Sequence, residues 1–292
     1  MNVELVHVQT ADGVRLDGAL RSPATATPPS LGIDLVICHH GVGGNFYGPY
    51  FFDAAGDRLL ASGCAVLRVN NRGHDQVVNG PHGKLGAQYE VVDDSRHDWR
   101  AWLDFAAQAG YRRVALWGHS LGAVKTIYYQ SVERDPRVVC AIASSPPRFA
   151  YEAYLASEQG ARFRTDMERA LACVAAGEPE AMILAAVPLE TAFAARTYVD
   201  KYGPGSRYDF FTHAPRSAVP LLLTLGELEV AGLAFRDLAA RGPALPASAP
   251  QITYALIEGA DHSYTSRLEP LWDTVRTWLS QVGTPRSEVG VR

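Results

Sequence analysis

One pattern repeats along most of the chain: a short, nearly continuous apolar run is followed by a segment with helical spacing. The runs are IDLVICHHG, CAVLRVNNRG, RRVALWGHS, VVCAIASSPP, VPLLLTLGE and ITYALIEGADH, and they lead into glycine, asparagine, serine or acidic residues. Strands that are buried on both faces have this composition. At 292 residues and 47% hydrophobic, the chain can bury one large core. The pattern therefore predicts an α/β fold with a mostly parallel sheet and helices on both faces.

Two intervals depart from this rhythm. At the start, VELVHVQT and VRLDGALRS are joined by ADG, which predicts an antiparallel hairpin. Between Pro147 and Pro220 lie about seventy residues with helical periodicity and loop signals, too many for an ordinary connection. We expect a helical cap there. The predicted division is 1–147 and 218–282 for the two parts of the core, 148–217 for the helical cap, and 283–292 for a flexible tail.

The segment Gly118-His119-Ser120-Leu121-Gly122 follows an apolar run and precedes a helical segment, as a nucleophile elbow requires. Such a turn is strained and crowded, so glycine fits both flanking positions. The turn would raise the Ser120 hydroxyl above the carboxyl end of the sheet and aim the Leu121 N–H at a developing oxyanion. A tight turn that merely contains serine would explain the pentapeptide alone, and its partner residues favour the catalytic interpretation.

With these features the chain resembles serine hydrolases of the α/β-hydrolase superfamily. Three further motifs carry the resemblance: His40-Gly41-Val42-Gly43-Gly44, the segment NNRGHD at 70–75, and GADHS around His262. NNRGHD departs from the family's R-G-x-G pattern at its last two residues. The resemblance implies an eight-stranded sheet with the cap inserted after the sixth strand. It also implies an oxyanion hole formed by the Val42 and Leu121 N–H groups, and His262 as the general base.

The resemblance also implies a carboxylate after the seventh strand, usually in a G-x-x-D pattern. The matching segment is Gly226-Glu227-Leu228-Glu229, and counting three residues from the glycine selects Glu229. Glu227 is the nearest alternative. Some relatives place the acid after the sixth strand, but the segment at 144–147 is SSPP and offers no carboxylate. The expected triad is Ser120, Glu229 and His262, in the chain order of this fold.

Other residues near these motifs are candidates for substrate contact. His40 and His119 adjoin the predicted oxyanion hole and nucleophile, and Phe46 and Tyr47 follow the oxyanion loop. His39 and His40 stand side by side, yet no third ligand occurs at metal-site spacing, so no metal is predicted. The four cysteines show no CxxC spacing and are expected to be core thiols rather than disulfides or ligands.

The charge distribution argues against several classes of partner. A formal net charge of -4, without blocks of like charge, provides no surface suited to nucleic acid or an anionic membrane. The N-terminal segment contains Glu4 and Asp12 and lacks a signal-peptide core, and no stretch is long enough to span a bilayer. A cytoplasmic location is expected. The oligomeric state is left open.

These features predict a serine hydrolase that cleaves a carboxylic ester of a small to medium organic molecule, without a cofactor. In composition and arrangement, the cap resembles a group of esterases and peptidase-like hydrolases that includes siderophore-ester hydrolases, which ranks esters above amides. Two alternatives stay open. The same triad could act on a carbon–carbon bond as a hydrolase or lyase, or the scaffold could serve a binding protein without catalysis.

Overall fold

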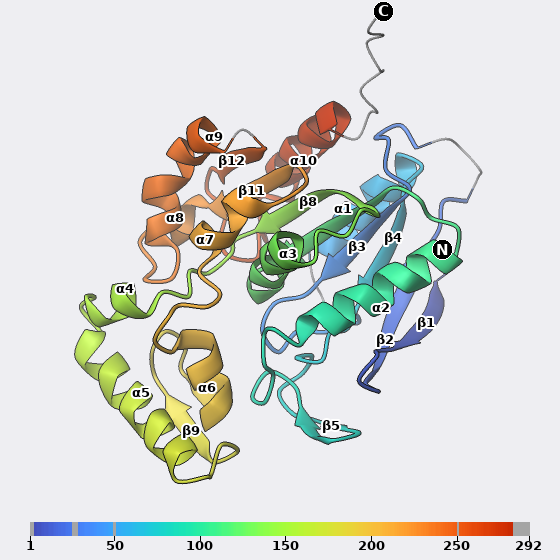
Figure 1. Ribbon diagram of the computed structural model, residues 1–292. Helices are drawn as coiled ribbons and strands as arrows, with labels where there is room; N and C mark the ends of the chain where they lie inside the picture. Colours follow the sequence, from blue (N-terminus) through green and yellow to red (C-terminus); the bar gives the residue numbers. More distant parts are fainter. Residues whose placement is uncertain (1–2, 25–28, 49–50, 250, 283–292) are drawn as a thin grey trace, which may run out of the picture.

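A computed structural model describes residues 3–24, 29–48, 51–249 and 251–282, so the predicted tail at 283–292 lies outside the described residues. At its centre is an eight-stranded sheet with the order β1-β2-β4-β3-β7-β8-β11-β12 (Figure 1). The strands are β1 (Glu4–Gln9), β2 (Arg15–Arg21), β3 (Leu35–His39), β4 (Ala65–Val69), β7 (Val114–His119), β8 (Val138–Ser144), β11 (Leu221–Gly226) and β12 (Ile252–Ile257).

The pairing of the strands confirms the predicted sheet. β1 and β2 form an antiparallel hairpin, and β2 is also antiparallel to β4. The pairs from β4 through β3, β7, β8 and β11 to β12 are all parallel. Every residue of β3, β4, β7 and β11 is buried, because helices cover both faces. The carboxyl ends of the parallel strands therefore share one edge of the sheet.

The helices pack in two layers. On one face, α1 (Phe52–Ala61) and α10 (Leu268–Val282) bury aromatic and aliphatic side chains against the sheet. On the other face lie α2 (Ser95–Gln108), α3 (Leu121–Val132), α8 (Arg236–Arg241) and α9 (Leu245–Ser248). Short 3₁₀ turns η2 (Glu227–Glu229) and η3 (Gly242–Ala244) precede α8 and α9. Among the described residues, no helix has the length and apolarity needed to cross a membrane.

The interval between β8 and β11 holds α4 (Tyr151–Leu155), α5 (Gly160–Ala175), α6 (Ala195–Tyr202), α7 (Phe210–His213) and the 3₁₀ turn η1 (Ala214–Arg216). In Figure 1, α4, α5 and α6 lie together beside the sheet, at the lower left. The expectation of helices without strands was incomplete. β9 (Met182–Ala185) and β10 (Thr191–Ala194) form an antiparallel hairpin within this interval. In β9 buried and exposed residues alternate, but an apolar run of four residues fits helix and strand equally well.

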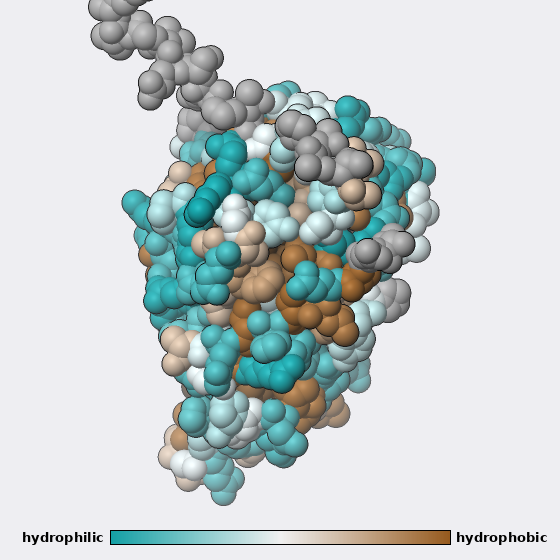
Figure 2. Space-filling model, turned by 90° about the vertical axis from the view of Figure 1, so that its right-hand side faces the viewer, coloured by the Kyte–Doolittle hydropathy of each residue, from teal (hydrophilic) through white to brown (hydrophobic). Residues whose placement is uncertain are grey.

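A second short hairpin, β5 (Val78–Gly80) with β6 (Gly83–Leu85), extends from the loop between β4 and α2. Three of the four cysteines are buried in the core, as predicted, and Cys173 is half-buried. Figure 2 shows the side of the molecule where the edge strand β1 lies, and hydrophobic patches there are interrupted by hydrophilic ones. Leu5 on β1 is among the exposed apolar residues of the chain.

Candidate active site

Ser120 lies at the sharp turn between β7 and α3, with φ 56° and ψ -123°. A positive φ is unusual for a residue other than glycine and is commonest where function requires it. The neighbouring glycines explain how the turn is accommodated. A Cβ on Gly118 would lie 2.2 Å from the Gly122 carbonyl oxygen, and one on Gly122 would lie 2.4 Å from the His39 carbonyl oxygen. Backbone contacts this close leave room for glycine only.

His262 lies in the loop after β12, and Glu229 ends the 3₁₀ turn after β11. The His262 Nδ1 is 2.6 Å from Glu229 Oε1. Because an ionised carboxylate only accepts hydrogen bonds, this contact places the ring proton on Nδ1 and leaves Nε2 as the basic nitrogen. Glu227 has a different partner: its Oε2 accepts the Gly259 N–H at 2.7 Å on the surface. The structure therefore brings Glu229, and not Glu227, to the histidine.

Two buried hydroxyl groups, those of Ser145 and Tyr264, form a hydrogen-bond chain that ends on the Glu229 carboxylate. Its Oε2 accepts the Gly226 N–H at 2.9 Å and the Ser145 hydroxyl. Since Ser145 donates its only proton to the carboxylate, the Tyr264 hydroxyl 2.8 Å away must be the donor to Ser145. Ser145 and Tyr264 have φ 50° and φ 54°, so both residues of this hydrogen-bond chain adopt a left-handed backbone. The sequence segment SSPP offers no carboxylate, but its second serine holds one.

Ser120 and His262 line the same cavity, whose volume is about 300 Å³. Of the described residues that line it, none except His262 has a side chain that can carry a charge near neutral pH, and aromatic, aliphatic and proline side chains dominate. The other lining residues are Val42, Leu121, Pro147, Phe149, Tyr154, Pro188, Leu189, Tyr202, Ala234 and Phe235. The cavity is thus built from the sheet edge, from the interval between β8 and β11, and from the segment before α8. An apolar wall of this kind suits an uncharged ligand.

The two predicted oxyanion-hole residues, Val42 and Leu121, both line this cavity. Leu121 is the first residue of α3, so its N–H has no acceptor within the helix. Val42 follows the carboxyl end of β3 in the loop that begins at His40. Backbone donors at a helix N-terminus and in a neighbouring loop suit an oxygen that gains negative charge.

The two histidines predicted to contact substrate are buried and do not line the cavity. His119 Nε2 lies 2.7 Å from the His262 carbonyl oxygen, so it donates a hydrogen bond to the loop that holds the candidate base. Burial lowers the pKa of His119 to about 3. His40 Nδ1 donates to the Gly41 carbonyl at 2.7 Å, and burial also lowers the pKa of His40 to about 3. In their neutral form, the rings of His119 and His40 each donate a hydrogen bond that holds a loop in place.

The predicted contacts Phe46 and Tyr47 also lie outside the cavity wall. Tyr47 is 63% exposed, and its hydroxyl donates to the Asp75 carboxylate at 3.0 Å. The Phe46 and Tyr47 rings meet edge to face with centroids 5.2 Å apart. Residues outside the predicted motifs line the wall instead, including Leu189 and Phe235. No local motif marks these residues, because they reach the cavity only through tertiary folding.

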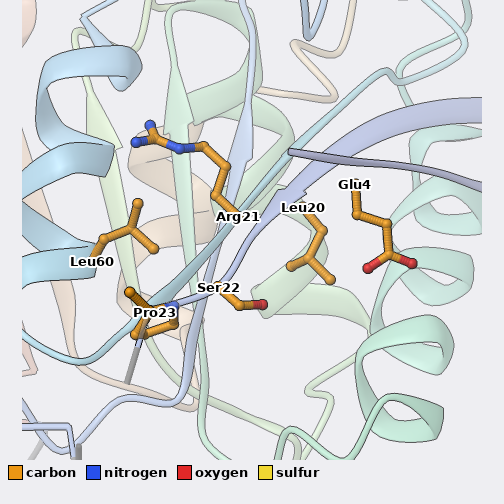
Figure 3. A pocket seen from close by; sticks show the side chains of 7 residues that line it. Glu4, Leu20, Arg21, Ser22, Pro23 and Leu60 are labelled. Atoms are coloured by element: carbon orange, nitrogen blue, oxygen red, sulfur yellow. The ribbon is translucent and has the colours of Figure 1, made fainter. Parts of the chain in front are cut away.

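A larger hollow of about 760 Å³ lies elsewhere on the molecule and is shown in Figure 3. Its wall includes Arg21 and Leu60, and Arg21 is paired in register with Val66 at the start of β4. It therefore lies at the amino edge of the parallel strands, opposite to the edge that carries Ser120.

Among the described residues, no group of three or more histidine, cysteine, aspartate or glutamate side chains is arranged to hold a metal ion.

Comparison with known proteins agrees with the architecture. The sequence model of the alpha/beta hydrolase family matches residues 35–285, and the chain belongs to this family. Est1E from Butyrivibrio proteoclasticus, solved with ferulic acid, has a TM-score of 0.69 and 18% identity, covering 95% of this chain and 99% of its own. The Pyrococcus furiosus esterase Pf2001 has a TM-score of 0.66 and 18% identity, covering 97% of this chain and 92% of its own.

The alpha/beta hydrolase GrgF from Penicillium sp. sh18 has a TM-score of 0.69 and 14% identity, covering 97% of this chain and 99% of its own. At these identities the likeness shows the shared fold. No curated protein sequence matches the chain.

Proposed function

We propose that this protein is a serine hydrolase that cleaves carboxylic esters through an acyl-enzyme intermediate on Ser120. One observation carries the proposal: a serine held at positive φ shares an apolar cavity with a histidine whose Nδ1 is fixed by Glu229. A serine hydroxyl is a weak nucleophile near neutral pH and needs an adjacent base. The Nε2 of His262, which lines the same cavity, can serve as that base.

The proposed reaction has two halves. His262 takes the Ser120 proton as the hydroxyl oxygen attacks the ester carbonyl, and the resulting oxyanion accepts hydrogen bonds from the Val42 and Leu121 N–H groups. His262 then gives its proton to the departing alcohol. In the second half, His262 takes a proton from a water molecule as the water oxygen attacks the acyl carbonyl. The bond to Ser120 Oγ then breaks, His262 returns the proton to that oxygen, and the carboxylic acid leaves. Glu229 holds the ring orientation and stabilises the imidazolium without taking the proton.

The cavity supports an uncharged substrate of small to medium size. A wall that includes Phe149, Tyr202 and Phe235 would bury an apolar acyl or alcohol group, and a charged group would lose its hydration there without a partner. The relatives support esters: Pf2001 is described as an esterase, and Est1E was solved with ferulic acid, a small aromatic acid.

Hydrolysis of p-nitrophenyl esters tests the proposal. We expect turnover of uncharged aliphatic and benzoyl esters, and at least tenfold lower kcat/KM for a hemisuccinate ester of matched length. Ser120→Ala should abolish the activity. If the folded protein hydrolyses none of these esters but cleaves a 1,3-diketone or a cyanohydrin in a Ser120-dependent reaction, the ester assignment is wrong and the carbon–carbon alternative holds.

A further inference from the structure

The chain contains only three lysines, and two of them are buried on one glutamate. Lys125 on α3 and Lys201 on α6 both donate to the carboxylate of Glu90, which lies in the loop between β6 and α2. Lys201 Nζ is 2.9 Å from Glu90 Oε1 and 3.2 Å from the Ala87 carbonyl oxygen. Charges buried this deeply persist only when they are paired. Glu90 therefore ties α6 to the helix that follows the nucleophile.

Lys125 also determines the orientation of a buried amide. Its Nζ donates to Asn71 Oδ1 at 2.8 Å, and the Gly73 N–H donates to the same oxygen at 2.8 Å. With two donors on Oδ1, the other end of the amide must be the NH₂ group. Asn71 Nδ2 lies 3.0 Å from His40 Nε2, so it donates to this ring nitrogen.

Accepting that hydrogen bond selects the tautomer of His40. If Nε2 is the acceptor, the ring proton of the neutral imidazole is on Nδ1. Nδ1 lies 2.7 Å from the Gly41 carbonyl oxygen, where only a donor fits. Both contacts thus require the same neutral form of the ring.

The Gly41 carbonyl and the Val42 N–H belong to one planar peptide unit. In a trans peptide these two groups point in opposite directions, so a hydrogen bond that holds the carbonyl also sets the direction of the N–H. Val42 lines the cavity that contains Ser120. The Gly44 N–H donates to the same carbonyl at 3.2 Å, so His40 makes the shorter of these two hydrogen bonds, which orient this peptide unit. The His40 side chain can therefore help to set where the candidate oxyanion donor points without touching the substrate.

We propose that Glu90, Lys125, Asn71 and His40 form a positioning relay that aims the Val42 N–H at the oxyanion, and that Lys201 couples this relay to α6. The relay rests on the proposed function for its catalytic consequence, because an aimed N–H stabilises an oxyanion only if one forms. It also assigns a role to α6, whose last residue Tyr202 lines the cavity. The helix α6, which contributes to the cavity wall, is thereby joined to the residues that orient the Val42 N–H.

Asn71→Asp is the sharpest kinetic test, because the ionised aspartate side chain has the same shape but cannot donate to His40 Nε2, which keeps only the longer hydrogen bond from the backbone N–H of residue 71, at 3.4 Å. We expect kcat on a reactive p-nitrophenyl ester to fall about tenfold to a hundredfold, with KM changed less than about threefold. Lys201→Met should lower kcat by about threefold to tenfold in the same way. Lys84→Met replaces the remaining lysine and should leave both constants unchanged. An unchanged kcat in folded Asn71→Asp and Lys201→Met would overturn the relay.

Nitrogen NMR of ¹⁵N-histidine-labelled protein tests the relay without turnover. The His40 signals, assigned by their loss in His40→Gln, should show a neutral ring with the proton on Nδ1 at pH 7. In Asn71→Asp, Nε2 should become protonated. A native ring protonated on Nε2 would overturn the relay whatever the kinetics show. A native ring protonated on Nδ1, in a protein that hydrolyses no ester, would instead support the relay and reject the proposed function.

Discussion

His262 and His40 represent two environments near the same cavity. The His262 side chain is 41% exposed and lies against one carboxylate, whereas His40 is 3% exposed and has both ring nitrogens in hydrogen bonds to protein groups. Burial and the Lys125 charge lower the pKa of His40. Only the Nδ1 of His262 hydrogen-bonds to a side chain within the described part of the chain, and the ring lines the cavity. The environment of His262 suits proton transfer, whereas the two hydrogen-bonded nitrogens of His40 hold that ring in a fixed orientation.

The contrast shows that residue type alone does not assign a role in this site. His40 and His119 both lie within the motifs predicted to be catalytic, yet their imidazoles hold backbone carbonyls. A histidine moves protons only where one nitrogen remains open to a reacting group. Variants that change the carboxylate beside His262, or the burial of the other two rings, can test this distinction.

The largest effect is expected from Glu229→Gln. The amide can present its NH₂ group to His262 Nδ1 and so favour the wrong tautomer, which removes the basic Nε2. We expect kcat/KM for ester hydrolysis to fall about 10³-fold to 10⁴-fold, without loss of fold by circular dichroism. A loss below tenfold would show that Glu229 does not orient the base.

The buried histidines should make stability depend on pH. His40 and His119 have pKa values of about 3 in the folded protein, below the value near 6.5 expected in the unfolded chain. Between these values the unfolded state binds more protons, so the free energy of unfolding falls as the pH is lowered from 6.5. At pH 5 each ring should lower the free energy of unfolding by about 2 kcal/mol relative to its value at pH 7.

Urea unfolding at pH 7 and pH 5 measures this loss. His119→Gln should reduce the difference between the two pH values by about 2 kcal/mol, because one of the depressed groups is removed. Equal pH dependence in the native protein and this variant would contradict the assignment of His119 as a neutral buried ring.

A smaller effect is expected at Ser145. Ser145→Ala removes one donor from Glu229 Oε2 and leaves the Gly226 N–H in place. A hydrogen bond to a charged group contributes about 1.5–3 kcal/mol, but the remaining donor compensates in part, so kcat should fall about tenfold. Ser280→Ala, on the exposed side of α10, is the matched control and should keep native kinetics.

The smallest effect is expected from Glu227→Gln. This carboxylate accepts the Gly259 N–H on the surface, whereas His262 Nδ1 hydrogen-bonds to Glu229. We expect kcat/KM within about twofold of the native value in the same assay. A loss of kcat/KM that equals or exceeds that of Glu229→Gln would show that Glu227, and not Glu229, orients His262.

The sequence was sufficient for features that depend on neighbouring residues. The alternation of apolar runs and helical segments predicted the sheet, because strands buried on both faces carry no polar alternation. The requirement for glycine at position 118 follows from a contact within a few residues of Ser120, with the Gly122 carbonyl, whereas Gly122 is crowded by the His39 carbonyl at the end of β3. The family's G-x-x-D pattern, counted from Gly226, also selected the glutamate that reaches His262, with Glu227 as the alternative.

Features that depend on distant segments were not predictable. Lys125, Glu90 and Lys201 meet from α3, a loop and α6, and a single lysine in a sequence is normally read as a surface residue. The wall of the cavity likewise joins Val42 with Leu189 and Phe235. The hairpin of β9 and β10 was missed because a four-residue strand carries too little periodicity to separate it from helix.

Covalent labelling by a fluorophosphonate tests the central claim most directly, because only an activated serine reacts rapidly. We expect one adduct per chain, located by peptide mass spectrometry on Ser120, absent from Ser120→Ala and formed at least a hundredfold more slowly in His262→Ala. A folded native protein that stays unlabelled, or carries the adduct on another residue, would contradict the account.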